Sequence, residues 1–81
     1  MTKDEIKQKI IEQIYEIAPE LEGETIPENE NLQRSLEIDS FDFLSLLTAL
    51  NDELDVEVPE SDYSDVDTLE HMAGYFAERL A

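Results

Sequence analysis

Apolar residues recur with the spacing of an α-helix in three stretches of this chain, and this pattern constrains the fold most strongly. In the first stretch the apolar stripe consists of isoleucines: Ile6, Ile10, Ile14 and Ile17. Thr2 followed by Glu5 fits a capping box that opens this helix. Pro19 cannot continue it, so the helix should end near Ile17 or Ala18.

The second helical stretch follows the pair Asp39-Ser40. Asp39 is a good N-cap residue, and Asp42 can serve the reciprocal role three positions later. The predicted helix begins at Asp39 or Ser40 and ends near Leu54. Its predicted buried stripe is leucine-rich and is widened by two neighbours: Leu44, Leu47, Leu50 and Leu54, with Phe43 and Leu46.

Two further helices are predicted after this one. Pro59 suits the first turn of a short helix that extends to about Tyr63 or Asp65. Asp67 and Glu70 then fit a capping arrangement that opens the last helix. The last helix has apolar residues at helical spacing: Leu69, Met72, Ala73, Phe76 and Leu80.

The fold class that these elements predict is all-α, a small four-helix bundle with three long helices and one short one. Residues 19–35 carry Pro19, Gly23 and Pro27 without sustained periodicity, which predicts a long loop after the first helix. Leu21, Ile26 and Leu32 are expected to pin that loop to the core. At 81 residues the chain is expected to form one domain spanning residues 1–81.

The charge balance is extreme, with 22 acidic against 5 basic residues and a net charge of -17. Such a field repels nucleic acid and anionic membranes and attracts proteins with basic patches. No apolar run is long enough to span a membrane, and the N-terminus does not resemble a signal peptide. We therefore expect a cytoplasmic protein, monomeric, without nucleic-acid or membrane partners.

The sequence offers little for catalysis or metal binding. Ser40 and His71 could belong to a hydrolase, but a G-x-S-x-G elbow is missing. The acidic cluster at residues 62–70 lacks the central glycine of an EF-hand loop, so it predicts diffuse cation binding at most. Without cysteine, the chain has no thiolate of its own. We therefore expect no enzyme activity and no dedicated metal site.

Ser40 has two possible roles on local physical grounds. A serine in the first turn of a helix presents its hydroxyl beside unpaired backbone N–H groups, where the helix dipole favours an attached phosphate. Alternatively, Ser40 only helps to cap the helix, as serines at such positions usually do. The residues alone leave both roles open.

The pair Asp39-Ser40 ahead of an apolar helix, together with Val58-Pro59 and the acidity, resembles the acyl carrier protein family. The resemblance covers nearly the whole chain. It implies that Ser40 carries 4'-phosphopantetheine, which a separate phosphopantetheinyl transferase installs from coenzyme A. The thiol of that arm would hold acyl or aminoacyl thioesters, and so would supply the sulfur that this chain lacks.

The resemblance also implies roles for other residues. An apolar slot for the acyl chain would be lined by apolar residues from the second long helix onward: Leu47, Leu50, Leu54, Val58, Tyr63, Val66 and Leu69. Partner enzymes with basic patches would contact acids near the second long helix: Asp39, Asp42, Asp52 and Glu53. The expected partners are the transferase, a loading ligase and acyl-processing enzymes.

Four positions depart from the usual family pattern. Glu37 replaces a glycine, Phe41 replaces a leucine, and Ser45 and Asn51 stand where glutamates are common. These positions lie on the surface that partner enzymes contact, so they favour a specialised carrier in fatty-acid, polyketide or other acyl metabolism. The triplet Asp-Ser-Phe is also similar to D-alanyl carriers. An aminoacyl carrier and an unmodified acidic interaction module remain as alternatives.

Overall fold

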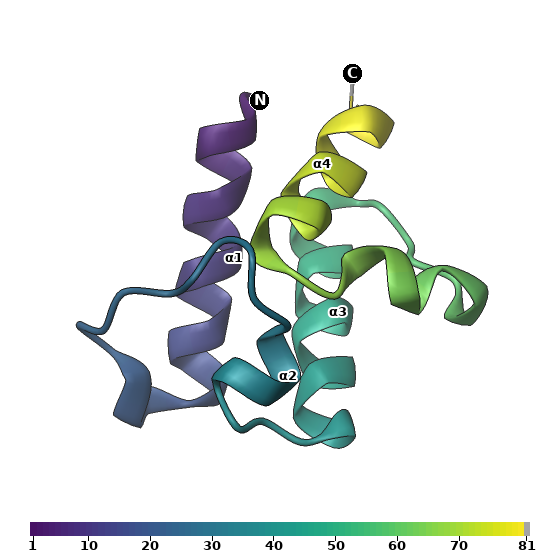
Figure 1. Ribbon diagram of the computed structural model, residues 1–81. Helices are drawn as coiled ribbons and strands as arrows, with labels where there is room; N and C mark the ends of the chain where they lie inside the picture. The colour runs from purple at the N-terminus through teal and green to yellow at the C-terminus, as the bar shows by residue number, and fades with distance from the viewer. Residues whose placement is uncertain (81) are drawn as a thin grey trace.

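The computed structural model describes residues 1–80, and these residues form helices joined by loops (Figure 1). In chain order the elements are α1 (Lys3–Ile17), η1 (Pro19–Leu21), α2 (Leu32–Ser35), α3 (Ser40–Leu54), η2 (Glu60–Val66) and α4 (Leu69–Leu80). Helix α1 packs against both α3 and α4. The described residues contain no strand, so the predicted all-α bundle is confirmed.

Helix α1 begins with the predicted capping box. The Glu5 amide donates to the Thr2 hydroxyl at 3.2 Å, and the Thr2 amide donates to the Glu5 carboxylate at 2.9 Å. Both bonds satisfy N–H groups that the helix itself leaves without partners. The bond from the Thr2 amide holds the pKa of the Glu5 carboxyl below its ordinary value. The helix ends at Ile17 because Pro19 starts a separate 3₁₀ turn.

Helix α3 also begins where the sequence predicts, at Ser40, with Asp39 as its N-cap. Asp39 Oδ1 accepts a hydrogen bond from the Asp42 amide at 2.8 Å. The reciprocal bond expected from the Asp42 side chain is absent from residues 1–80. The helix ends at Leu54 because Asp55 turns into the left-handed region with φ 56°.

The buried face of α3 differs from the predicted stripe at Leu44, whose side chain is 42% exposed. The residues that this helix buries are Phe43, Leu46, Leu47, Leu50 and Leu54. Each residue turns a helix by about 100°, so Leu44 lies roughly 120° around the axis from Leu50. The prediction that Leu44 belongs to the buried stripe was therefore wrong.

The start of α4 is a second correction. Thr68, and not Asp67, caps this helix, because its hydroxyl accepts a hydrogen bond from the His71 amide at 3.0 Å. The Glu70 side chain, predicted to complete the cap, instead forms ion pairs with Lys3 and Lys7. The short helix η2 extends to Val66, slightly beyond its predicted end, and Pro59 immediately precedes it.

The segment predicted as one long loop contains two short helices, η1 and α2. Ile26 and Leu32 are buried and Leu21 is half-buried, so these three residues pin the segment as predicted. Backbone bonds also tie the segment to the start of α4. The Leu32 amide donates to the Asp67 carbonyl at 2.8 Å, and the Glu70 amide donates to the Glu28 carbonyl at 2.9 Å.

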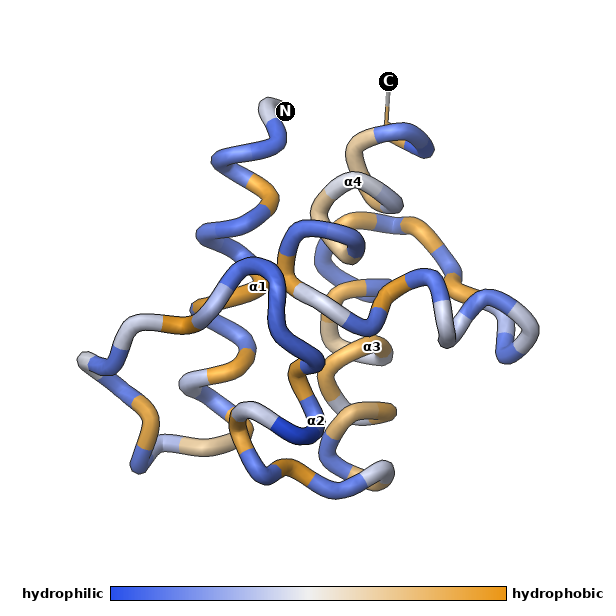
Figure 2. Tube along the Cα trace, in the orientation of Figure 1, coloured by the Kyte–Doolittle hydropathy of each residue, from blue (hydrophilic) through white to orange (hydrophobic). Residues whose placement is uncertain are grey.

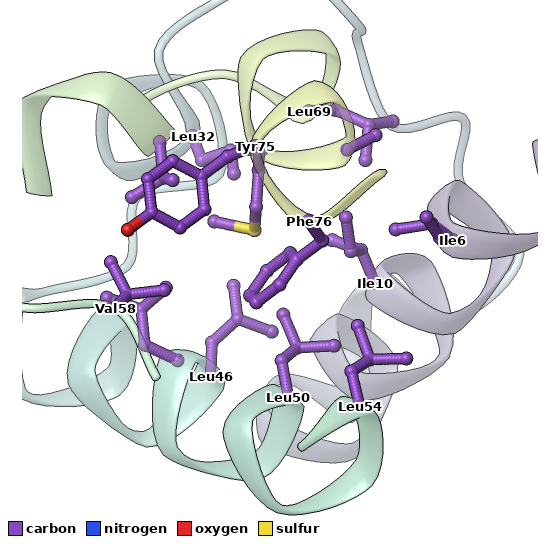
Figure 3. Close-up of a cluster of buried hydrophobic side chains, with 14 of the residues drawn as sticks. Ile6, Ile10, Leu32, Leu46, Leu50, Leu54, Val58, Leu69, Tyr75 and Phe76 are labelled. Carbon is purple, nitrogen blue, oxygen red and sulfur yellow. The ribbon is translucent and has the colours of Figure 1, made fainter. Parts of the chain in front are cut away.

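The core lies between α1, α3 and α4, where the apolar positions of the tube turn inward (Figure 2). Phe76 of α4 is fully buried and points toward Leu46 and Leu50 of α3, with Ile10 of α1 beside it (Figure 3). The Tyr75 ring meets the Phe76 ring edge-on, with the ring centres 5.9 Å apart. This continuous packing fixes the position of α3 relative to its neighbours.

Three lysines of α1 pair with acids of other elements. Lys7 Nζ lies 2.5 Å from Glu28 and 2.7 Å from Glu70, and Lys3 also pairs with Glu70. Hydrogen bonds from both lysines lower the pKa of Glu70 to about 2. Lys9 contacts Glu53 of α3 at 3.0 Å. These pairs join the long loop, α3 and α4 to the polar side of α1.

Within residues 1–80, none of the helices is long and apolar enough to cross a membrane.

Candidate functional site

Ser40 is the first residue of α3, and its side chain is exposed. The 15-residue helix behind it packs into the core through its buried leucines. The Ser40 hydroxyl accepts a long hydrogen bond, 3.5 Å, from the side-chain amide of Gln33. This hydroxyl therefore sits on a rigid element, close to solvent and nearly free of competing partners.

The start of α3 provides a favourable place for an anion next to Ser40. Asp39 satisfies the amide of Asp42, whereas the amides of Ser40 and Phe41 find no hydrogen-bond acceptor within residues 1–80. Unpaired amides and the helix dipole together favour a negatively charged group at a helix N-terminus. A phosphate ester on the Ser40 hydroxyl is compatible with this geometry.

A hollow of about 490 Å³ opens directly beside Ser40. Its walls come from α3, from the short helix η2 and from the segment around α2. The lining residues are Asn31, Gln33, Ser40, Phe43, Leu44, Tyr63, Ser64 and Asp67. The lining combines polar groups with the apolar side chains of Phe43 and Leu44, and most of the surface that it exposes is apolar.

The arrangement does not form a hydrolytic site. His71 is exposed, and its Nδ1 lies 2.7 Å from Asp67 Oδ1. Within residues 1–80 the hydrogen-bond partner of the Ser40 side chain is Gln33, and His71 does not reach it. The described residues also contain no group of three or more potential ligands that could hold a metal ion.

Comparison with known proteins fits this geometry. The family described as phosphopantetheine attachment site matches residues 8–76 of the chain. This chain belongs to that family. Its cofactor is 4'-phosphopantetheine, which domains of this family carry through a covalent bond. Family domains of this type are carriers without a catalytic site of their own.

A solved structure shows the same fold. A chain in the crystal structure of the curacin biosynthetic pathway HMG synthase in complex with acetyl donor-ACP superposes with a TM-score of 0.83. The two sequences are 24% identical, and the match covers 96% of this chain and 99% of that chain. The small helical bundle of this carrier domain is therefore a carrier-protein fold.

The backbone at Glu37 explains why a glycine is usual at this position in the family. It lies in the left-handed region, with φ 55°. Glycine reaches that region without the steric cost that a Cβ atom brings, which accounts for the glycine that usually stands here. The connection between α2 and α3 therefore holds a left-handed conformation at a residue that carries a Cβ atom.

The outer face of α3 carries two exposed apolar side chains next to Ser40. Phe41 is 78% exposed and Leu44 is 42% exposed. They line a shallow groove along the helix together with Ser45, Thr48, Ala49 and Asp52. Between Asp42 and Asp52 this face bears no charge, although the chain as a whole is strongly acidic.

The structure places the predicted acyl-slot residues in two different environments. Most of them are buried in the closed core: Leu47, Leu50, Leu54, Val58, Val66 and Leu69. Tyr63 is half-buried and lines the hollow beside Ser40. An apolar slot between these residues requires that the core side chains separate, so this role stays a prediction.

The four acids predicted to contact partners also differ in their surroundings. Asp52 is exposed on α3, and Asp42 is half-buried. Asp39 is exposed but already acts as the helix cap. Glu53 accepts hydrogen bonds from Lys9 at 3.0 Å and Gln13 at 3.1 Å, so its carboxylate is tied to α1. Their role in partner binding likewise stays a prediction.

Proposed function

We propose that Ser40 is the residue that carries 4'-phosphopantetheine and that this carrier presents an acyl group to partner enzymes as a thioester of the arm. The observation that carries the proposal is the exposed hydroxyl at the start of a well-anchored helix, beside unpaired amides. Attachment joins the Ser40 oxygen to phosphorus. The diphosphate bond of coenzyme A breaks, and adenosine 3',5'-bisphosphate leaves.

The residues around Ser40 support this role without taking part in bond making. Asp39 holds the first turn of α3, in which Ser40 lies, through its bond to the Asp42 amide. A group carried on Ser40 remains close to the protein, so each bound partner meets it at high effective concentration.

The test is attachment in vitro. The chain is incubated with coenzyme A and a broad-specificity phosphopantetheinyl transferase, and its intact mass is measured. We expect the mass of one phosphopantetheinyl group on the wild-type chain and no gain for Ser40→Ala. The matched control is Ser45→Ala, one turn further along α3, which should be modified normally. No adduct on the wild type, or an adduct on Ser40→Ala, would show that the proposal is wrong.

We further propose that the cargo is a short acyl group such as acetyl. Two observations support this choice. The core residues that would have to open for a long chain are almost fully buried, and the similar solved structure contains an acetyl donor carrier. An aminoacyl cargo is the alternative, because the sequence around Ser40 is also similar to D-alanyl carriers.

Cargo length can be tested on the same protein. The transferase is supplied with acetyl-coenzyme A or with a long-chain acyl-coenzyme A, and amide NMR spectra of the two products are compared. We expect the acetyl form to leave the resonances of Leu50, Val66 and Leu69 unchanged. If the long-chain form shifts those resonances and gains stability, the core does open, and the predicted apolar slot is supported instead.

We propose that partner enzymes contact Phe41 and Leu44, with Asp42 and Asp52 at the edge of the contact. Exposed apolar side chains beside a functional group are typical anchors of interfaces. Phe41→Ala should therefore slow modification by the transferase several-fold at every salt concentration. Asp52→Asn should slow it only at low salt. Equal rates for Phe41→Ala and wild type across the salt range would contradict an apolar anchor.

A further inference from the structure

A groove of about 840 Å³ lies between α1 and the loop that follows η1. One wall is the stretch of α1 from Asp4 to Tyr15, and the other is formed by residues 23–28, which cross α1 in the ribbon (Figure 1). The groove shares no lining residue with the hollow beside Ser40 or with the outer face of α3. Neither arm attachment nor the contact proposed for Phe41 accounts for it.

The groove has an apolar floor. Ile11 and Tyr15 of α1 are half-buried, so part of their apolar surface still faces solvent. Ile26 of the loop and Leu69 of α4 are buried and line the groove as well. Most of the surface that the groove exposes is apolar. A concave surface of this kind is typical of binding sites, because a ligand that covers it removes apolar area from water.

The shape of the groove is held by contacts between its walls. The Tyr15 hydroxyl donates a hydrogen bond to the Glu24 carbonyl at 2.7 Å, which ties the loop to α1. Lys7 Nζ lies 2.5 Å from Glu28 at the other end of the loop segment. The Glu28 carbonyl also accepts a hydrogen bond from the Glu70 amide of α4. The loop is therefore fixed at both ends, so a ligand meets a preformed site.

The rim of the groove is negatively charged. Its lining includes one ammonium group and four carboxylates, those of Asp4, Glu5, Glu24 and Glu28. The ammonium group, that of Lys7, is already paired with two acids. Asp4 and Glu24 are exposed on opposite walls, and within residues 1–80 their carboxylates form no hydrogen bond or ion pair. Both walls thus offer a carboxylate to a cationic ligand.

We propose that this groove docks a basic segment of a partner protein. An apolar side chain of that segment covers Ile11 and Tyr15, and Lys or Arg side chains on either side of it pair with Asp4 and Glu24. A second copy of this chain is a poor occupant, because most of its basic residues already pair with acids of their own chain. Docking here leaves Ser40 uncovered, so a docked partner holds the carrier while other enzymes reach the attachment site.

Binding of a model segment by the unmodified chain tests the proposal, which does not depend on attachment at Ser40. The probe is a fluorescently labelled helical peptide with leucines on one face and lysines on the other. Fluorescence anisotropy measures its dissociation constant in about 0.15 M salt, at which charges farther apart than about 8 Å are largely screened. The overall negative charge of the chain then contributes little, and we expect saturable binding.

Two double variants with the same change in net charge separate the groove from the rest of the surface. Asp4→Asn/Glu24→Gln removes the unpaired carboxylate of each wall and should weaken binding about three- to tenfold, as expected for two exposed ion pairs. Glu16→Gln/Glu22→Gln neutralises exposed acids of α1 and the loop outside the groove. This control should weaken binding less than about twofold. Circular dichroism melting verifies that both variants are folded.

A second peptide tests the apolar floor. Serines replace its leucines, so it keeps the charge of the first peptide but cannot cover Ile11 and Tyr15. We expect it to bind at least about tenfold more weakly. Amide NMR locates the bound leucine peptide, which should shift resonances of Ile11, Tyr15 and residues 23–26 and leave those of residues 40–45 unchanged.

Several results would overturn docking in the groove. These are no binding of the leucine peptide, equal binding of the serine peptide, equal weakening by the two double variants, or shifts confined to α3. Saturating leucine peptide should also leave the rate of modification by the transferase unchanged, and inhibition by it but not by the serine peptide would show that the two sites are not separate. A chain that binds the peptide but gains no arm contradicts the proposed function alone.

Discussion

Replacement of Asp39 by alanine should destabilise the carrier through the cap of α3, and replacement by asparagine should not. Asp39 Oδ1 accepts the Asp42 amide at 2.8 Å, and alanine removes that acceptor. Asparagine keeps an oxygen at the same position but loses the charge, and it is about as good an N-cap as aspartate. The pair of variants therefore separates the hydrogen bond from the electrostatics of the helix end.

The size of the effect follows from the surroundings of the cap. Loss of an N-cap typically costs about 0.5–2 kcal/mol. Asp39 is exposed, so water can partly satisfy the Asp42 amide, which places Asp39→Ala near about 1 kcal/mol. In a domain of this size, that change lowers the melting temperature by about 4–8 °C. For Asp39→Asn we expect a loss of less than about 0.5 kcal/mol, because the dipole interaction lost is partly offset by reduced repulsion from Asp42.

Urea unfolding followed by circular dichroism measures these differences in the free energy of unfolding. The comparison requires that the variants show the same dependence of that free energy on urea concentration. Asp52→Ala is the matched control, since it removes the same charge from the same helix without removing a cap. It should change the free energy of unfolding by less than about 0.5 kcal/mol. The reasoning is refuted if Asp39→Ala matches the wild type, or if Asp39→Asn is as unstable as Asp39→Ala.

Three further predictions address the core, the ion pairs and the left-handed residue. Leu50→Ala should cost about 2–5 kcal/mol in urea unfolding because its side chain is fully buried, and a smaller loss would indicate a loosely packed core. The pKa of Glu70 is lowered from 4.5 to about 2, mainly by hydrogen bonds from Lys3 and Lys7, so its contribution to stability is complete above pH 4.5 and is lost as the pH falls toward 2. The melting-temperature gap between wild type and Glu70→Gln should therefore narrow over that range, and a constant gap would contradict the ion pairs. Glu37→Gly should raise the free energy of unfolding by about 0.5–1 kcal/mol, whereas Glu37→Ala should not, as urea unfolding of both variants can establish.

Local signals in the sequence were sufficient to place the ends of α1 and α3. Thr2 and Asp39 bond to amides only three positions away, so the cap and its target are adjacent in the sequence. Pro19 ends α1 by the geometry of its own ring. Ser40 could be proposed as the attachment site for the same reason, because that role depends on the helix that begins with it.

The errors have two origins: competition by distant residues for one group at the start of α4, and the angle of one residue around α3. The carboxylate of Glu70 matches a capping pattern, but Lys3 and Lys7 lie far away in the sequence and engage it in the folded chain. Thr68 is then the residue that caps α4. Leu44 is apolar and was assigned to the core, although its position around the helix turns it toward the outer face.

The hollow beside Ser40 had no signal in the sequence. Its lining comes from segments separated along the chain, and residues such as Gln33 and Ser64 belong to no motif by themselves. Only the packing of the α2 segment and η2 around the start of α3 brings them together. The ion pair between Glu53 and Lys9, which connects α3 to α1, likewise could not be predicted from the sequence.

The pairing of basic residues with acids inside each molecule affects how several molecules of this protein interact. Of the five basic residues, Lys3, Lys7, Lys9 and Arg79 each face a carboxylate of their own chain. Little positive charge is then left to bridge two copies, and outside the uncharged outer face of α3 each copy presents mainly carboxylates. We expect concentrated solutions of this carrier to resist self-association at low ionic strength, so that many copies can crowd around one enzyme without sticking to each other.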